Sequence, residues 1–192
     1  MQPHSQPELL TPRLRLAAFT LADAPDVFSY ARDPQVSKYT TWRTHESLKD
    51  AEDYLRSVLA RGPDDYCWAI RLRDEPSVIG AIECGHCLNE KAEIHYVLAS
   101  SHWNRGLMTE AFAAVMSWAF GHYSNIDCIR TRAVAENVGS RRVMEKCGLV
   151  FEEFRAYNWA KSDQPVTQAE YANSREKWAQ DQSASVNSSH SS

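Results

Sequence analysis

The segment AEIHYVLASSHWNRGLMTEA (92–111) decides the fold of this 192-residue chain. It begins with a strand-like run of apolar and aromatic residues and ends, from Met108, in apolar residues at helical spacing. A polar loop that contains Arg105 and Gly106 joins the two parts. A helix N-terminus presents unpaired N–H groups to an anion, and glycine lets the backbone approach it closely. The segment therefore predicts a strand, a short polar loop and a helix. The loop is suited to a phosphate group, but many α/β proteins have an ordinary tight connection with the same pattern.

The flanking sequence predicts an α/β domain with a mixed sheet. Three apolar runs between 66 and 98 are separated by short turns, which favours an antiparallel meander. Gly148 lies where a left-handed residue ends a helix, and 34–44 is expected to be a loop. The expected strands are 14–16, 66–73, 77–84, 92–98, 126–134, 151–159 and 166–171, and the expected helices are 20–32, 47–59, 102–120 and 137–147.

Length and composition indicate one globular domain. Hydrophobic residues make up 43% and charged residues 24% of the chain, as in ordinary globular proteins. We expect a flexible N-terminus at 1–10, the domain at 11–178 and a disordered tail at 179–192. The tail is polar and of low complexity from Asp181 on, so it has little apolar surface to bury.

Charge and targeting signals exclude several partner classes. The net charge of −4 gives no long-range attraction to nucleic acid or to an anionic membrane. The longest stretch without a charged residue, 111–126, is shorter than a membrane span, and the N-terminus lacks the pattern of a signal peptide. We therefore expect a cytoplasmic protein. Cys84 and Cys87 form the one short cysteine spacing, and without a second ligand pair no metal is expected.

Two motifs, HWNRGLMTEA (102–111) and AENVGSRRVMEKCGL (135–149), resemble those of the GNAT superfamily of N-acetyltransferases. TPRLRL (11–16), WAIRLRD (68–74) and RAYNW (155–159) resemble its Rim-type branch, which includes enzymes that acetylate the N-terminal amines of ribosomal proteins. The resemblance implies a mixed, mostly antiparallel sheet that splits to hold acetyl-CoA, with helices on both faces. It also implies direct acetyl transfer to a primary amine.

The resemblance places acetyl-CoA between the parallel strands 92–98 and 126–134. On the first strand, the residues that would pair with the pantetheine arm through their backbone are Tyr96, Val97 and Leu98. The backbone amides that would hold the pyrophosphate belong to Asn104, Arg105, Gly106, Leu107, Met108 and Thr109.

Further contacts to the cofactor are implied at the second motif and the loop. Asn137 would hydrogen-bond the cofactor from the second helix, next to Ser140. Asn104 stands where the general family pattern has glycine, and asparagine tolerates positive φ better than other non-glycine residues. Met144 stands where many relatives carry a tyrosine that acts as an acid on the leaving thiolate.

Acetyl transfer needs a neutral amine and a proton or hydrogen bond for the leaving sulfur. Glu93, on the strand that enters the split, is the candidate base; a solvated strand carboxylate is the alternative. Ser140 is the candidate acid, unless its hydroxyl only satisfies the backbone of the first helical turn. Tyr157 is the reserve acid, with packing as its alternative role.

The acceptor pocket is expected between Tyr39, Trp42 and Trp159, although these aromatic residues are also suited to covering the core. The branch resemblance favours a protein or peptide N-terminal α-amine as acceptor. A small-molecule amine (a polyamine, amino acid or antibiotic) is the alternative, and a non-catalytic acyl-CoA-binding module is a third. Dimers are common in this branch, and the last strand or 154–159 would carry a homodimer contact.

Overall fold

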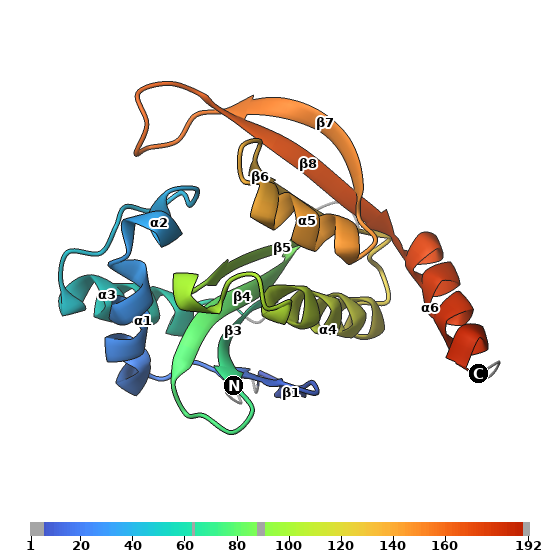
Figure 1. Ribbon diagram of the computed structural model, residues 1–192, viewed down its shortest axis with the longest axis horizontal. Helices are drawn as coiled ribbons and strands as arrows, with labels where there is room; N and C mark the ends of the chain where they lie inside the picture. The colour runs from blue at the N-terminus through green and yellow to red at the C-terminus, as the bar shows by residue number, and fades with distance from the viewer. Residues whose placement is uncertain (1–5, 63, 88–90, 190–192) are drawn as a thin grey trace.

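The computed structural model of the protein describes residues 6–62, 64–87 and 91–189. One eight-stranded sheet has the order β1-β2-β3-β4-β5-β6-β8-β7, with helices on both faces (Figure 1). The strands are β1 (Leu9–Leu10), β2 (Leu14–Ala18), β3 (Asp65–Leu72), β4 (Val78–Cys87), β5 (Lys91–Leu98), β6 (Cys128–Val134), β7 (Val150–Tyr157) and β8 (Val166–Ser174). The helices are α1 (Ala24–Ala31), α2 (Pro34–Ser37), α3 (Leu48–Leu59), α4 (Leu107–His122), α5 (Val138–Lys146) and α6 (Arg175–Ser189). The α/β architecture and the mostly antiparallel sheet are confirmed.

The predicted meander is present as β3, β4 and β5, which pair antiparallel in sequence order. Gly80 lets two of these strands approach closely, because a Cβ atom there would lie 2.3 Å from the carbonyl oxygen of Val97. Gly148 has φ +80°, so it ends α5 in the left-handed conformation that the sequence predicts.

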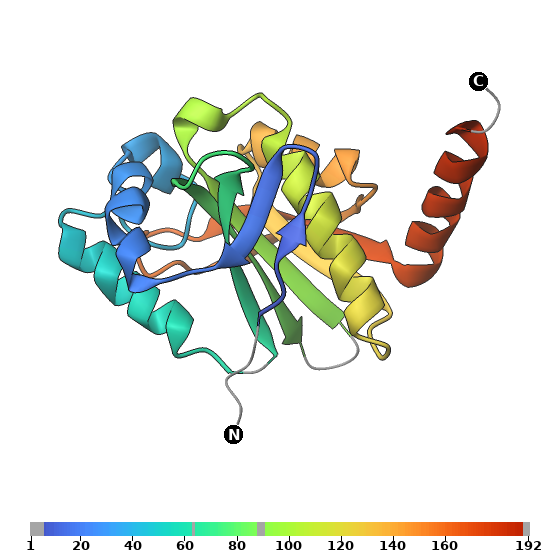
Figure 2. The same ribbon diagram turned by 90° about the horizontal axis from the view of Figure 1, so that it is seen from below.

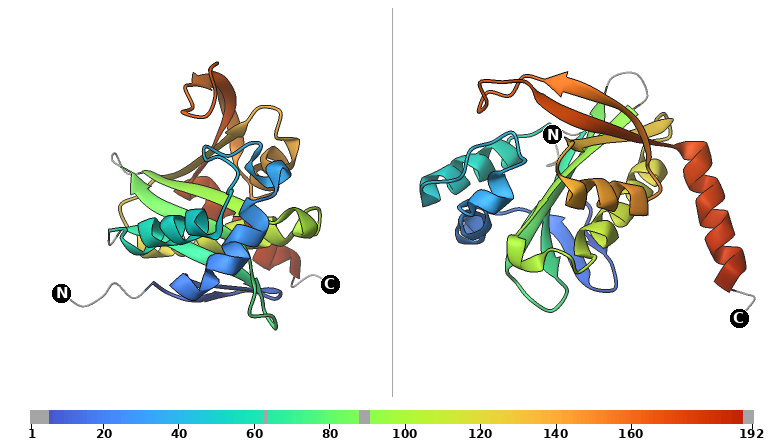
Figure 3. Two further views of the ribbon diagram at one scale, coloured as in Figure 1. Left: turned by 90° about the vertical axis from the view of Figure 1, so that its left-hand side faces the viewer. Right: turned by 45° about the horizontal axis from the view of Figure 1, so that its top comes forward.

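Two hydrophobic cores lie on opposite faces of the sheet. Figure 3 shows the helices that cover these faces, α4 on one side and α1 and α3 on the other. The larger core is centred on α4, whose Phe112 and Val115 are fully buried, and it extends to Met144 on α5. The smaller core joins α1 and α3 to the other face of β3 and β4. Because both faces are covered, the middle of β3 is a continuous buried run.

β5 and β6 form the one parallel pair in this sheet, and they separate after a short contact. Their pairing ends at Glu93 and Arg130, whereas β6 goes on to pair with β8 as far as Val134 and Gln168. The facing edges of β5 and β6 are therefore unpaired toward their C-terminal ends. This is the split that the resemblance implied.

The ends of the chain differ from the sequence-based expectation. Gln6 exchanges two hydrogen bonds with the backbone of Cys67, and the carbonyl of Pro7 accepts from the indole of Trp68, so the N-terminal segment from residue 6 is attached to β3. Where disorder was expected from 179, α6 continues to Ser189 and projects from the sheet (Figure 2). Its first turn is anchored because Trp178 packs on Phe120. Residues 1–5 and 190–192 lie outside the described ranges.

The segment that was expected to be a loop contains the short helix α2. Asp33 caps it by accepting a hydrogen bond from the backbone N–H of Gln35, 2.9 Å away. The same carboxylate accepts a hydrogen bond from the hydroxyl of Ser100, which lies in the loop before α4. Hydrogen bonds from Ser100 and Gln35 hold the pKa of Asp33 below its ordinary value. Asp33 therefore ties the N-terminal helices to the predicted phosphate loop.

Candidate active site

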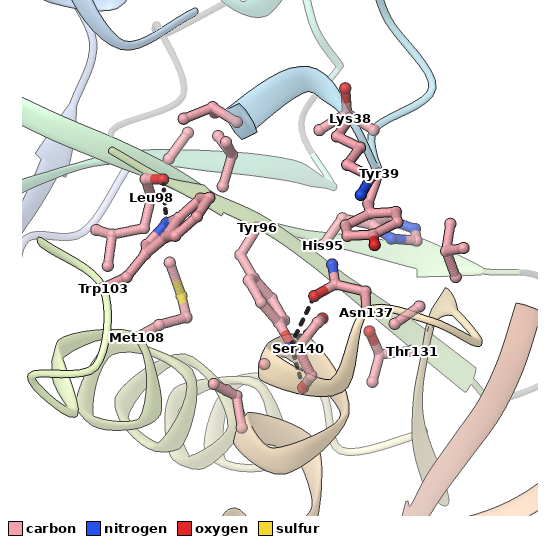
Figure 4. A pocket seen from close by; sticks show the side chains of 18 of the residues that line it. Lys38, Tyr39, His95, Tyr96, Leu98, Trp103, Met108, Thr131, Asn137 and Ser140 are labelled. Carbon is pink, nitrogen blue, oxygen red and sulfur yellow. Dashed lines mark hydrogen bonds between the residues drawn. The ribbon is translucent and has the colours of Figure 1, made fainter. Parts of the chain in front are cut away.

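A cavity of about 1100 Å³ opens where β5 and β6 diverge. It is lined by both edges of the split, the loop before α4, the first turns of α4 and α5, and the segment after α2 (Figure 4). Its volume lies at or above the upper end of the range for sites that hold drug-sized ligands. The cavity therefore has room for a long ligand and a second molecule at its far end.

The loop before α4 presents backbone amides to this cavity. Asn104 has φ +59° and Gly106 has φ +72°, and these turns bring the chain into the helix. No side chain caps α4 at Gly106, so the N–H groups of its first turn have no partner within the helix. Leu107, Met108 and Thr109 line the cavity beside Asn104 and Gly106. Unpaired amides at the positive end of a helix fit a diphosphate.

Arg105 does not line the cavity, unlike the other loop residues expected to hold a pyrophosphate. Its carbonyl accepts a hydrogen bond from the guanidinium of Arg13. Arg13 also donates to Glu110 through its backbone N–H and through its side chain, and the hydroxyl of Thr11 donates to the same carboxylate. Glu110, in the first turn of α4, thus braces the loop against the start of β2.

We expect Glu110→Gln to weaken CoA binding about tenfold without altering any residue that lines the cavity, since charge-assisted hydrogen bonds contribute roughly 1.5–3 kcal/mol. Burial disfavours the charge of Glu110, but hydrogen bonds from Thr11 and Arg13 outweigh it and hold its pKa below the usual 4.5. The hydrogen bonds from Thr11 and Arg13 to the ionised Glu110 carboxylate are therefore fully present at neutral pH. Their contribution is lost only as the pH falls through that depressed pKa. Calorimetric titration with CoA at pH 7 measures the change, and equal affinities of variant and wild type would contradict it.

On β5, two of the predicted backbone contacts face the split and one does not. The carbonyl of Ile94 accepts from the hydroxyl of Thr131. The carbonyl of Leu98 accepts from the indole of Trp103 (Figure 4). Peptide groups of alternate residues point to the same side of a strand, so that of Tyr96 also faces the split. Val97, which lines the cavity, turns its peptide group toward β4. The N–H and C=O of Tyr96 are the backbone groups best placed for an extended amide ligand.

Asn137 and Ser140 come together at the start of α5. The side-chain oxygen of Asn137 accepts from the backbone N–H of Ser140 and so caps this helix. This leaves the amide nitrogen of Asn137 as a donor at the cavity wall. The hydroxyl of Ser140 lies 2.8 Å from the phenol oxygen of Tyr96, which reaches across from β5. Met144 is fully buried in the core behind this group.

Tyr157 lies away from the cavity. Its phenol donates to the carboxylate of Glu170, and burial together with this hydrogen bond raises the pKa of Tyr157. Arg132, whose guanidinium is 5.0 Å from the ring of Tyr157, points from the face of β6 opposite to the one that packs on α5. The two predicted acids, Ser140 and Tyr157, therefore lie on opposite faces of the sheet.

Glu93 does not line the cavity either, but it contacts a residue that does. Its carboxylate lies 3.2 Å from Nε2 of His95 and 3.6 Å from the guanidinium of Arg132. The hydrogen bond from His95 and the charge of Arg132 outweigh burial and hold the pKa of Glu93 below its ordinary value. His95 is a cavity residue that the sequence argument missed. Its signal was the two-residue spacing, which places both side chains on one face of β5.

Tyr39, Trp42 and Trp159, the aromatic residues expected at the acceptor pocket, all line the cavity. Lys161 ties their segments together, because its ammonium donates to the carbonyl of Ser37 at 2.6 Å and to that of Trp42 at 3.2 Å. Burial and the nearby charge of Arg43 lower the pKa of Lys161.

We expect Lys161→Met to raise KM for the acceptor about fivefold, because the wall that contains Trp42 loses this clamp, whose two hydrogen bonds contribute of order 1 kcal/mol each. CoA affinity is expected to stay the same, since the phosphate loop is not touched. Steady-state kinetics with each substrate varied in turn separates the two effects. An equal change in both constants would mean that the clamp supports the whole fold.

Two further findings concern other kinds of site. Among the side chains that the structure describes, no three His, Cys, Asp or Glu groups lie close enough to hold a metal ion. The cysteine spacing 84–87 falls partly outside this set, because the side chains of His86 and Cys87 are not described. No helix within residues 6–62, 64–87 and 91–189 is both long and apolar enough to cross a membrane.

Comparison with known proteins agrees with this geometry. The model of a family described as "Acetyltransferase (GNAT) domain" matches residues 13–150. The uncharacterized N-acetyltransferase YoaA of Bacillus subtilis (strain 168) is 31% identical over 149 residues, which are 74% of this chain and 82% of the relative.

Solved structures match the fold. A GNAT-family acetyltransferase from Bacillus anthracis superposes with a TM-score of 0.79 at 23% identity, over 88% of this chain and 99% of that one. RimL, described as a ribosomal alpha-N-protein acetyltransferase in complex with coenzyme A, gives 0.75 at 15% identity, over 89% and 99%. With its family model matched over most of its length, this chain belongs to the GNAT family of acetyl-CoA-dependent N-acetyltransferases.

Proposed function

We propose that this enzyme transfers acetyl from acetyl-CoA to the α-amine of a protein or peptide N-terminus. The observation that carries the proposal is the single cavity that runs from the free amides of α4, through the split, to His95 and the aromatic wall. Acetyl-CoA supplies the activated thioester. All other steps belong to side chains and peptide groups of this chain.

The cofactor would be held along one side of the cavity. The amides of Leu107 to Thr109 would bind its pyrophosphate, and the peptide group of Tyr96 would pair with its pantetheine arm. Arg142 and Lys146, which line the cavity from α5, add positive charge for its remaining phosphate. Asn137 would donate a hydrogen bond from its amide nitrogen.

His95 is the proposed base, and Glu93 acts through it. The Glu93 carboxylate, which stays ionised because its pKa is depressed, accepts from Nε2 of His95 and so orients the ring. Nδ1 then offers its lone pair to the amine. An α-amine has a pKa of about 8 and a lysine about 10.4, so deprotonation at pH 7 costs about 1.4 and 4.6 kcal/mol respectively. An imidazole is a sufficient base for the first and a poor one for the second.

Ser140 is the proposed donor to the departing sulfur. Its hydroxyl lines the split at the N-terminus of α5, where the partial positive charge of the helix also favours a thiolate. Tyr157, on the opposite face with its hydrogen donated to Glu170, takes no part in this proposal.

The charges at the acceptor end favour a peptide over a polyamine. Lys38 and Arg61 line this end with Glu83, whose carboxylate is paired with Arg61 at 2.6 Å. Glu83 and Glu136 are the two carboxylates among the described residues that line the cavity, and Arg61 neutralises the first, so a polycation would meet at most one unpaired negative charge beside several positive ones. Similarity to RimL and the sequence motifs of the Rim-type branch point the same way.

The test is acetyl transfer to a panel of acceptors, followed by free-thiol release and mass spectrometry. The panel contains peptides with a free N-terminus, the same peptides blocked at the N-terminus but with an internal lysine, single amino acids and spermidine. We expect one acetyl group on the free N-terminus and none on the blocked peptide. Turnover of spermidine or amino acids without any peptide acetylation would refute the proposed acceptor, although the enzyme would remain an acetyltransferase.

A further inference from the structure

We propose that Tyr96 is a positioning residue for Ser140. When the phenol of Tyr96 donates its hydrogen bond to the Ser140 hydroxyl oxygen, the Ser140 hydroxyl can donate its own hydrogen to the sulfur in the split. This inference rests on the proposed role of Ser140 and deepens it. The sequence argument used only the backbone of Tyr96, and its side chain has no part in the function proposed above.

The phenol bridges the two elements that border the split. Tyr96 extends from β5 toward the first turn of α5, where its oxygen lies 2.8 Å from the Ser140 hydroxyl and 3.1 Å from the Ser140 carbonyl (Figure 4). Its ring is fixed by an edge-on contact with Phe112 of α4, at 5.7 Å between ring centres. Tyr96 and Ser140 both line the cavity. The pair is therefore rigidly held where a thioester in the split would pass.

The hydrogens of this pair allow two arrangements. A phenol has one hydrogen to donate. If Tyr96 donates to the Ser140 carbonyl, the Ser140 hydroxyl donates to the phenol oxygen. If Tyr96 donates to the Ser140 hydroxyl oxygen, the serine hydrogen is released toward the split. A negative charge on sulfur stabilises the second arrangement, so Ser140 can donate to the sulfur when the charge develops. Before that, the first arrangement keeps the Ser140 hydroxyl paired with the phenol.

Tyr96 acts as a neutral donor and not as an acid. Its burial raises the pKa of the phenol far above the ordinary value, so the phenol stays protonated at working pH. A thiol has a pKa of about 8.5, so a leaving thiolate needs a hydrogen bond and no strong acid. In the transfer, His95 takes the proton of the ammonium form. The carbon–nitrogen bond then forms, the carbon–sulfur bond breaks with its electron pair on sulfur, and the second proton that the nitrogen loses passes through solvent to the thiolate, so that CoA leaves as the thiol. Ser140 and Tyr96 keep their protons and change only the atoms to which they donate hydrogen bonds.

This arrangement also accounts for Met144. A thioether has no proton to donate, and Met144 is fully buried on the core-facing side of α5. In this chain the tyrosine whose phenol lies at the start of α5 is Tyr96 on β5, and not a residue of α5 itself.

The test is the pKa of the thiol of bound CoA in the Tyr96→Phe variant, measured from the ultraviolet absorbance of the thiolate as a function of pH. In the wild type we expect this pKa to lie below that of free CoA, because Ser140 donates to the thiolate. In Tyr96→Phe we expect it to rise by about one unit, which is a tenfold loss of the thiolate at a given pH. We also expect kcat to fall about tenfold with little change in either KM.

Tyr123→Phe is the matched control. Tyr123 belongs to the same hydrophobic core, donates to the carbonyl of Asp64 at 3.2 Å and does not line the cavity. Its replacement is expected to leave the thiol pKa unchanged. Ser140→Ala provides a second variant, and adding Tyr96→Phe to it is expected to cause no further rise in the thiol pKa.

Three results would overturn the inference. They are a bound thiol pKa in Tyr96→Phe equal to that of the wild type, an equal change in Tyr123→Phe, and additive effects of Tyr96→Phe and Ser140→Ala. The absorbance titration uses CoA alone, without an acceptor. A depressed thiol pKa in a protein that acetylates no peptide would therefore refute the proposed acceptor and leave the role of Tyr96 intact.

Discussion

Replacement of His95 by glutamine is expected to lower kcat/KM for a peptide N-terminus about a thousandfold at pH 7, within the range for loss of a general base. Glutamine keeps polar contact with the Glu93 carboxylate but has no lone pair basic enough to take a proton from the amine. His95 is a cavity residue, whereas Glu93 reaches the cavity only through it. We expect CoA affinity to be unchanged, since no phosphate or pantetheine contact involves this side chain.

The pH dependence separates a base from a merely structural histidine. An α-amine with a pKa of about 8 is neutral without help in alkaline solution. The deficit of His95→Gln is therefore expected to shrink as the pH is raised through that value. His122→Gln, at the end of α4, is the control, because it removes a histidine that contacts Tyr66 outside the cavity. A loss of the same size at every pH would argue against a proton-transfer role.

The largest effect on stability is expected from Arg175→Met, which should lower the free energy of unfolding by about 3 kcal/mol or more. The guanidinium donates to the carbonyls of Phe120, Tyr123 and Ile126 at 2.6, 2.5 and 2.8 Å. The first of these lies in the last turn of α4, where carbonyl groups have no partner within the helix. Methionine preserves much of the aliphatic volume but leaves all three oxygens without this donor.

Urea unfolding followed by circular dichroism measures the change, and the melting temperature should fall by roughly 10 °C for a domain of this size. Lys177→Met is the matched control, since it removes one exposed ion pair with Asp181 in the same helix. Such a pair contributes about 0.5 kcal/mol or less. Equal stabilities of the two variants would show that α6 is not needed to hold the end of α4.

Local signals in the sequence were sufficient for most of the framework. The meander could be predicted because alternation and turn residues act between neighbours in the chain. The same holds for the loop before α4, where Gly106 and Asn104 adopt the positive φ angles that such residues tolerate. The ends of the chain could not be predicted this way. Gln6 and Arg175 form hydrogen bonds with residues about 50 to 60 positions away in the sequence. No local sequence pattern predicts these contacts.

By itself, the sequence determined the fold class and the strand–loop–helix segment around Gly106, because these depend on short-range periodicity and on residues that tolerate positive φ. The split of the sheet was expected only through the resemblance to the GNAT superfamily. Only the tertiary structure decided which side chains meet across the split. It brought His95 to the cavity wall beside Glu93, set Tyr157 on the face of the sheet opposite to Ser140, and joined Tyr96 to Ser140. These outcomes depend on the register between strands that are far apart in the chain, and a shift of one residue turns every side chain to the opposite face. Alternation within one strand shows which side chains share a face, but the partner that each residue meets on a distant strand is settled only when the two cores pack on either side of the sheet.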